Sequence, residues 1–149
     1  MFTVQLAKTD MDLLKCWPVL QLLRPQLEAA NYLPLVRSML LEGYHLAFIE
    51  PAGQSMAAAA IGFRYLYKLH DGQQVYIDDL TTLEAYRGLG YAGALLDYVI
   101  DWAEEKGYPC VTLDSGPHRH AAHRLYLNKG FQLSSYHFIR KNSNGQPDL

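Results

Sequence analysis

Hydrophobic and polar positions in the first half of the chain predict a short strand, two helices and then three strands. Residues 2–7 alternate apolar and polar side chains like a strand, and from Asp10 apolar residues recur at helical spacing as far as Pro25. Residues 32–43 predict a second helix that ends at its glycine. Strands are predicted at 44–50, 55–69 and 75–84, although the alanines at 57–60 by themselves favour helix.

The second half alternates between helices and strands. The clearest helix is predicted from Tyr91 to Lys106, and its apolar face consists of Leu95, Leu96, Val99, Ile100 and Ala103. The predicted elements after it are a strand at 110–114, a helix at 120–130 and a strand at 131–141, which is in one or two pieces. The polar tail at 142–149 is expected to be frayed. Since no linker or repeat interrupts this order, one mixed α/β domain over residues 1–149 is predicted.

Composition narrows the function classes. The chain has 149 residues, 50% of them hydrophobic and 19% charged, with a formal charge of −2, so neither nucleic acid nor an anionic membrane is an expected partner. The first residues lack the pattern of a signal peptide, and no apolar run approaches the length of about 20 residues that spans a bilayer. Cys16 and Cys110 show no metal or redox spacing. These features predict a cytoplasmic protein with two packed, reduced thiols.

The segment EAYRGLGYAG at residues 84–93 admits two interpretations. It contains G-x-G-x-x-G, the dinucleotide-binding fingerprint, and Asp114 closes the next strand 21 residues after Gly93, near the position of a ribose-binding acid. It also contains R-x-x-G-x-A from Arg87, and either pattern offers backbone N–H groups and a helix N-terminus to a phosphate. Polar residues separate the preceding strand from the glycines, and only 56 residues follow Gly93, too few for a doubly wound sheet. The second interpretation is therefore favoured.

Two motifs in order resemble the GNAT superfamily of acetyl-CoA-dependent N-acetyltransferases. YRGLGYAGALL is similar to the cofactor motif of that family, with Arg87, Gly90 and Ala92 at its defining positions. AHRLYLNKGF is similar to the second motif, and Tyr126 in it lies 34 residues after Ala92, with a helix and a strand between them. The resemblance implies the GNAT fold, a twisted and mostly antiparallel sheet of six or seven strands flanked by about four helices.

The same resemblance implies that acetyl-CoA is the co-substrate. Amides of the loop would hold its pyrophosphate and the adjoining strand edge its pantetheine arm. The expected cofactor-binding residues are Leu80, Thr81, Thr82, Arg87, Gly88, Leu89, Gly90, Tyr91, Ala92 and Arg119. Many family members carry an asparagine seven residues before the motif tyrosine, where this chain has Arg119, so that contact is not carried over and Arg119 is expected to face the phosphates or solvent.

Acetylation of an amine needs a group that accepts a proton, because alkyl amines with a pKa near ~10 are mostly protonated at neutral pH. Asp78 and Asp79 are the candidates, since unpaired charge in an apolar strand is costly. Consecutive strand residues face opposite sides, so only one is expected in the acceptor cleft unless a bulge intervenes. The phrase YIDDLTTLEAYRGLG also resembles the acidic pair of spermidine/spermine N-acetyltransferase, which implies a cationic acceptor. The alternative is that both aspartates pair with nearby basic residues.

Tyr126 is the candidate general acid, whose phenol would protonate a leaving thiolate of pKa near ~8.5. Trp17, Arg24 and Tyr32 lie in the helices that usually wall the acceptor site in this family. His120 and His123 share a helix face, but no third ligand is evident, so no metal site is predicted.

These residues favour N-acetylation of a small-molecule amine by direct attack in a ternary complex, since no covalent nucleophile is evident. Acetylation of a protein lysine or N-terminus is the second hypothesis, and a non-catalytic acyl-CoA-binding sensor is the third. The expected partners are the amine acceptor and, in a homodimer, a second copy of the chain.

Overall fold

The computed structural model describes residues 2–143, so the predicted frayed tail lies outside the described residues from residue 144 onward. The chain divides into two compact units, residues 1–113 and 114–149, which are described separately. The single domain over residues 1–149 stays a prediction.

Three short helices open the first unit: α1 (Asp10–Lys15), α2 (Trp17–Leu23) and α3 (Ala29–Leu41). Thr9 caps α1 through a reciprocal capping box with Asp12, which satisfies amide donors of the first turn. The helix predicted from Asp10 to Pro25 is divided at Cys16, because Pro18 stands in the first turn of α2 and has no amide hydrogen to continue α1. Cys16 is fully buried, and this burial raises the pKa of its thiol to about 12.

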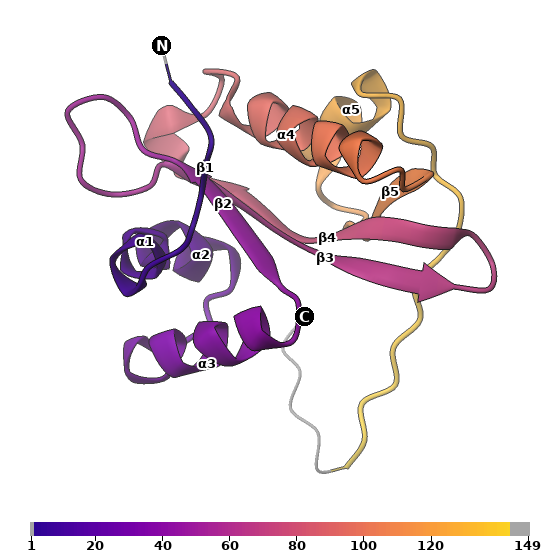
Figure 1. Cartoon of the computed structure of the whole chain (residues 1–149), viewed down its shortest axis with the longest axis horizontal. Coiled ribbons are helices and arrows are strands. Elements are labelled where there is room, and N and C mark those ends of the chain that lie inside the picture. Colours follow the sequence, from indigo (N-terminus) through magenta and orange to yellow (C-terminus); the bar gives the residue numbers. More distant parts are fainter. Residues whose placement is uncertain (1, 144–149) are drawn as a thin grey trace. The chain divides into compact units, whose positions relative to one another are not determined.

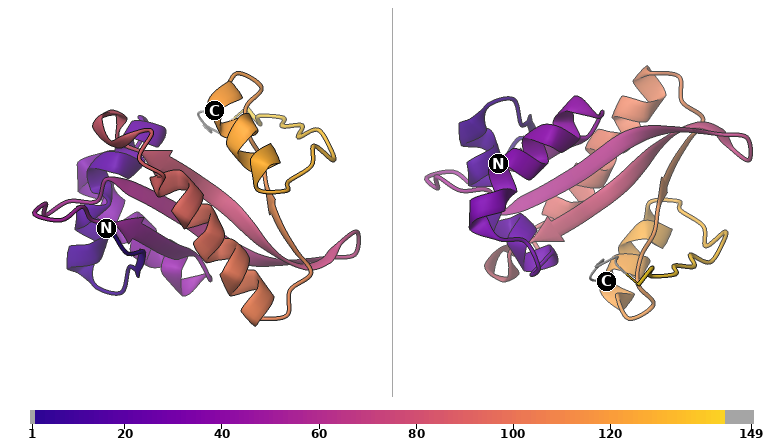
Figure 2. Two further views of the ribbon diagram at one scale, coloured as in Figure 1. Left: turned by 90° about the horizontal axis from the view of Figure 1, so that it is seen from above. Right: turned by 90° about the horizontal axis from the view of Figure 1, so that it is seen from below.

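The sheet contains β1 (Gln5–Leu6), β2 (His45–Ile49), β3 (Ala59–Lys68), β4 (Gly72–Thr82) and β5 (Cys110–Leu113), in the spatial order β1-β2-β3-β4-β5. The first four strands are antiparallel to their neighbours and β5 is parallel to β4. The helix α4 (Tyr91–Glu105) covers one face and α1–α3 cover the other (Figures 1 and 2). The predicted mixed, mostly antiparallel α/β fold is confirmed, with five strands among the described residues rather than six or seven.

The predicted apolar face of α4 packs on the sheet. Leu95, Leu96, Val99 and Ala103 are buried, and Ile100 is half-buried. On the opposite face, Leu13, Val19 and Tyr32 pack against side chains of β2 and β3. The sheet therefore lies between two layers of helix, and its strands β3 and β4 carry most of the residues of interest.

A β-bulge interrupts the pairing of β3 and β4. Gly62 lies opposite Asp79 whereas Phe63 lies opposite Ile77, so Asp78 is the extra residue on β4. Such a bulge resets the alternation of side chains along its strand. Two consecutive residues can then face the same side of the sheet.

The second unit contains α5, which runs from His120 to Asn128. The first unit also contains a 3-10 helix, η1 (Glu84–Tyr86), just before α4. The strand predicted at 131–141 is not present, because these residues have no hydrogen-bonded partner strand among those described. Most of their apolar side chains are exposed, namely those of Leu133, Tyr136, Phe138 and Ile139, whereas Phe131 is half-buried. The strand prediction for this segment is thus wrong in the described structure.

Candidate active site

The loop between η1 and α4 leaves its backbone open to solvent. Residues 87–90 are exposed, and Gly88 and Gly90 have φ angles of 80° and 87°, which favour glycine. No atom lies within 4 Å of where a Cβ of either glycine would stand. Gly90 is the N-cap of the 15-residue α4 and makes no side-chain cap hydrogen bond. Open amides at a long helix N-terminus fit the pyrophosphate of a nucleotide.

The predicted cofactor-binding side chains around this loop differ in what they contact. The Nε of Arg87 donates to the carbonyl oxygen of Thr82 at 3.3 Å, which ties the loop to the end of β4. Tyr91 is buried and packs edge-on against Phe2, whereas Leu89 is exposed. Within this segment it is therefore the backbone, rather than these side chains, that is arranged for an anion.

The edge of β4 is only partly used by its parallel neighbour. β4 pairs with β5 from Gln74 to Ile77, and the pairing ends where Ile77 lies opposite Leu113. The predicted pantetheine-binding residues 80–82 lie beyond that end. The hydroxyl of Thr81 donates to the carbonyl oxygen of Val19 at 3.2 Å, so its side chain is committed to α2. The backbone of residues 80–82 is the part of β4 that fits an extended arm.

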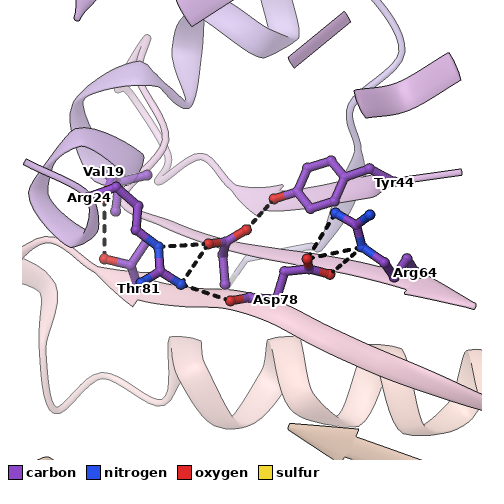
Figure 3. A network of polar contacts seen from close by, with 7 residues as sticks. Val19, Arg24, Tyr44, Arg64, Asp78 and Thr81 are labelled. Carbon is purple, nitrogen blue, oxygen red and sulfur yellow. Dashed lines mark hydrogen bonds and ion pairs between the residues drawn. The ribbon is translucent and has the colours of Figure 1, made fainter. Parts of the chain in front are cut away.

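Both aspartates face the α1–α3 side of the sheet because of the bulge. Arg24, at the end of α2, donates from Nε to Oδ1 of Asp79 at 3.1 Å and from a terminal nitrogen to the carbonyl oxygen of Asp78 at 2.9 Å (Figure 3). The hydroxyl of Tyr44 donates to Oδ2 of Asp79 at 2.7 Å. Asp79 thus binds one cation and one neutral donor.

Asp78 has a separate partner. The Nε of Arg64 on β3 donates to both of its carboxylate oxygens at 3.0 Å, and a terminal nitrogen lies 2.9 Å from Oδ2 (Figure 3). Burial raises the pKa of Asp78, although the hydrogen bonds and charge of Arg64 oppose this shift. The carboxylate is therefore more basic than its ion pair alone would make it.

Tyr44 reaches Asp79 only because Gly62 has no side chain. A Cβ at Gly62 would stand 1.7 Å from the Tyr44 hydroxyl. Burial raises the pKa of the Tyr44 phenol well above its ordinary value, so the hydroxyl stays a donor. The guanidinium of Arg64 also lies over the Tyr44 ring, 5.5 Å from its centroid. A glycine inside a strand pattern was the available signal for this close approach.

We call Arg24, Tyr44, Arg64, Asp78 and Asp79 the bulge cluster. It holds two arginines and two aspartates, so the formal charges of these side chains cancel. The alternative in which both aspartates pair with basic residues is what the structure shows. Of the side chains that bind the aspartates, Arg24 is the most exposed, at 40%, against 29% for Arg64.

Of the other two predicted wall residues, Tyr32 is in the core and Trp17 is partly buried against it. Tyr32 is buried and donates to the carbonyl oxygen of Leu13 at 2.6 Å, and its ring lies 4.9 Å from that of Trp17. Of the three predicted wall residues, Arg24 is the one that reaches the bulge cluster. Neither Tyr44 nor Arg64 was predicted from the sequence.

In the second unit, Ser115 lies between the side chains of Tyr126 and His123. The side chain of Ser115 hydrogen-bonds Tyr126, and its Oγ lies 3.1 Å from Nε2 of His123. Burial raises the pKa of Tyr126, while the positive charge of Arg119 and the hydrogen bond of Ser115 oppose that rise. Tyr126 is half-buried and its ring lies 5.9 Å from that of Phe131. The phenol is therefore protonated at neutral pH.

His123 also lies beside His120, with ring centroids 6.2 Å apart. In the described part of the chain, no three histidine, cysteine or acidic side chains are grouped so that they could hold a metal ion. Among residues 2–143, no helix has the length and apolar character needed to cross a membrane.

Two comparisons with known proteins match most of this chain. A model of the acetyltransferase (GNAT) family matches residues 13–131. A relative from Bacillus subtilis (strain 168), named uncharacterized N-acetyltransferase YhdJ, is 33% identical over 123 residues, which cover 82% of this chain and 86% of the relative.

Two solved structures resemble the fold at low identity. An acetyltransferase from Trypanosoma brucei gives a TM-score of 0.79 at 18% identity over 95% of this chain and 100% of that one. The aminoglycoside antibiotic 6'-N-acetyltransferase AAC(6')-Ih from Acinetobacter baumannii gives 0.78 at 16% identity over 95% and 99%.

Proposed function

This chain belongs to the acetyltransferase (GNAT) family, and on that premise we propose that it acetylates a primary amine of a small cationic molecule. Acetyl-CoA-dependent acetyl transfer follows from the family. The acceptor and the roles of single residues are our proposal. The transfer is a direct attack in a ternary complex.

The observation that carries the proposal is that the bulge cluster already binds a cation. The guanidinium of Arg24 occupies one oxygen of Asp79, where it makes a charge-assisted hydrogen bond. An acceptor ammonium makes the same kind of contact. Arg24 is partly exposed at a helix end, so its contact is exchanged for a ligand at lower cost than the buried contact of Tyr44. Aminoglycosides, named for one structural neighbour, are amines of this class.

The loop and β4 supply a fit for acetyl-CoA. The amides from Gly88 to Ala92 hold the pyrophosphate and the backbone of residues 80–82 binds the pantetheine arm. Arg119 is exposed and contributes positive charge to the phosphates. When bound, acetyl-CoA supplies the activated acetyl thioester.

Three side chains of the chain bind the ammonium and handle protons. Asp79 binds the acceptor ammonium, and Asp78, whose pKa is raised chiefly by burial, accepts its proton. Tyr126 donates the proton that the leaving thiolate requires. Its raised pKa keeps the phenol protonated until that moment.

A screen of acetyl-CoA consumption tests the proposal. The acceptors are polyamines, aminoglycosides, neutral amines, amino acids and peptides. Each acceptor is assayed with the native chain, with Asp79→Asn and with the control Asp101→Asn, whose side chain is exposed on α4. We expect turnover of cationic amines, and a rise in their KM of about thirtyfold in Asp79→Asn, because a hydrogen bond to a charged group is worth about 2 kcal/mol. The amide oxygen introduced by Asp79→Asn can still accept the hydrogen bond of Tyr44, so this variant removes the charge and keeps the contact.

Other outcomes redirect the assignment. Turnover of peptides alone supports a protein acetyltransferase, and saturable acetyl-CoA binding without turnover of any amine supports a sensor. Equal KM values in the native chain and Asp79→Asn would remove the cation-binding role of Asp79. The resemblance to spermidine/spermine N-acetyltransferase, the homodimer and the cytoplasmic location stay predictions.

A further inference from the structure

The phenol of Tyr126 is the end of a short hydrogen-bonded chain. Ser115 hydrogen-bonds the Tyr126 side chain and lies 3.1 Å, Oγ to Nε2, from His123. All three residues are half-buried and belong to the second unit. A serine hydroxyl can accept one hydrogen bond while it donates another, so it can connect an imidazole to a phenol.

Local geometry brings these groups together. His123 and Tyr126 are three residues apart on α5, a spacing that places side chains on the same face of a helix. Ser115 lies in the segment before α5 and reaches both. The three hydrogen-bonded side chains therefore all come from residues 115–126.

We propose that Ser115 and His123 form a proton relay that resupplies the phenol of Tyr126 during acetyl transfer. This inference rests on the proposed role of Tyr126 as general acid. The Tyr126 O–H bond breaks and its proton forms the S–H bond of the coenzyme thiol. The Ser115 proton then passes to the phenolate oxygen, and the Nε2 proton of His123 passes to Ser115. Nδ1 of His123 takes up from solvent a proton equivalent to the one that the acceptor ammonium has released through Asp78, so the imidazole stays neutral.

The neighbouring charges suit this direction of transfer. Arg119 lies near enough to lower the pKa of Tyr126, so it stabilises the phenolate that forms for a moment. An imidazole can take up a proton at one ring nitrogen while it gives one up at the other, so it can pass a proton from solvent to Ser115. His120 is the other titratable ring beside His123 and is exposed on the same helix. The half-buried phenol of Tyr126 is thus connected through Ser115 to His123, which can take up a proton from solvent.

A titration tests the hydrogen-bonded chain without any turnover. Tyrosine labelled with 13C at Cζ is incorporated into the full chain, and Tyr126→Phe assigns the Tyr126 resonance. Because the Ser115 hydrogen bond lowers the Tyr126 pKa, we expect that pKa to rise in Ser115→Ala and to stay in place in Ser115→Thr, which keeps the hydroxyl. An unmoved Tyr126 titration in Ser115→Ala would overturn the proposal.

Kinetics test the relay itself. We expect Ser115→Ala and His123→Asn each to lower kcat about tenfold or more, with the KM for acetyl-CoA unchanged, since only proton supply is affected. Ser115→Thr retains kcat, and His120→Asn serves as the matched control on the same helix. In a Tyr126→Phe background neither substitution has a further effect, because the relay has lost its acceptor.

The two failures are distinguishable. If the native chain acetylates no amine, the proposed function fails, and the titration alone decides whether the chain of hydrogen bonds exists. If the native chain is active but His123→Asn lowers kcat equally with and without Tyr126, the relay is wrong and the proposed function stands. A loss that appears only in KM would also overturn the relay.

Discussion

The bulge cluster and the Ser115–His123–Tyr126 chain differ in how they carry charge. In the bulge cluster, two arginines and two aspartates form ion pairs, so formal charges are present and cancel. In the hydrogen-bonded set of Ser115, His123 and Tyr126, two hydroxyl groups and an imidazole are joined by hydrogen bonds. In the proposed function, the first arrangement exchanges one cation for another and accepts a proton at Asp78, whereas the second supplies a proton from Tyr126.

Their origins in the chain differ as well. The bulge cluster joins residues from α2, β3 and β4 with Tyr44 just before β2, and it depends on a register shift between two strands. The hydrogen-bonded set of Ser115, His123 and Tyr126 comes from α5 and the segment just before it. The proposed acceptor-binding residues are therefore brought together by long-range packing, whereas the proposed general acid is positioned by local structure. Substitution of Tyr126 should therefore lower kcat, whereas substitutions that disturb the cation-binding contacts of Asp79 should change the acceptor KM.

Tyr126→Phe should give the largest effect. Removing the phenolic proton leaves binding groups in place, so we expect kcat to fall about a hundredfold or more while the KM of the acceptor stays nearly constant. Steady-state kinetics measure both constants. Tyr67→Phe, at an exposed tyrosine, is the control. A rise in the acceptor KM with unchanged kcat would mean that Tyr126 binds the acceptor. Tyr126 and the bulge cluster would then not differ in their kinetic roles.

Gly62→Ala should affect the bulge cluster through packing. The new Cβ collides with the Tyr44 ring and hydroxyl, so we expect a loss of about 1–3 kcal/mol in the free energy of unfolding. Urea unfolding measures this loss. The acceptor KM should rise at the same time, because Tyr44 can no longer donate to Asp79.

Tyr44→Phe is the comparison for that variant, since it removes the hydroxyl and keeps the ring. If Gly62→Ala were as stable as the native chain, the close approach of Tyr44 would not be what requires glycine at this position. If it changed kcat and left KM constant, the contact between Tyr44 and Asp79 would serve the chemical step rather than acceptor binding.

Arg24→Ala should have a smaller effect. Its ion pair is partly exposed, so we expect a stability loss of at most about 1 kcal/mol. Because Asp79 no longer has its internal cation, the KM for cationic amines should fall severalfold, while that for neutral amines stays constant. Arg37→Ala, which removes an exposed ion pair with Asp10, is the control. A higher KM for cationic amines would mean that Arg24 itself contacts the acceptor.

Sequence reasoning predicted local features well. The loop glycines, the apolar face of α4 and the family motifs each occupy a short segment, so their pattern is visible without tertiary structure. The bulge at Asp78 was foreseen only as an exception to strand alternation, because a register shift depends on the partner strand. Arg64 and Tyr44 carried no signal of their own, since each acquires its role through a contact 14 or 35 residues away, and Gly62 signalled only that some group approaches the strand closely. The strand predicted at 131–141 failed for the same reason: its alternation is local, but a strand requires a partner.

The pH dependence of stability should show the smallest effect, at Asp78. Burial raises its folded pKa above the ordinary value of 3.8, so folding favours the protonated carboxyl. Its contribution to stability is full below that ordinary value and is lost as pH rises through the raised folded pKa. The free energy of unfolding of the native chain, measured relative to Asp78→Asn, should therefore decrease across this interval and then level off. An increase would mean that the ion pair with Arg64 outweighs burial, and Asp78 would then be a fixed anion rather than a proton acceptor.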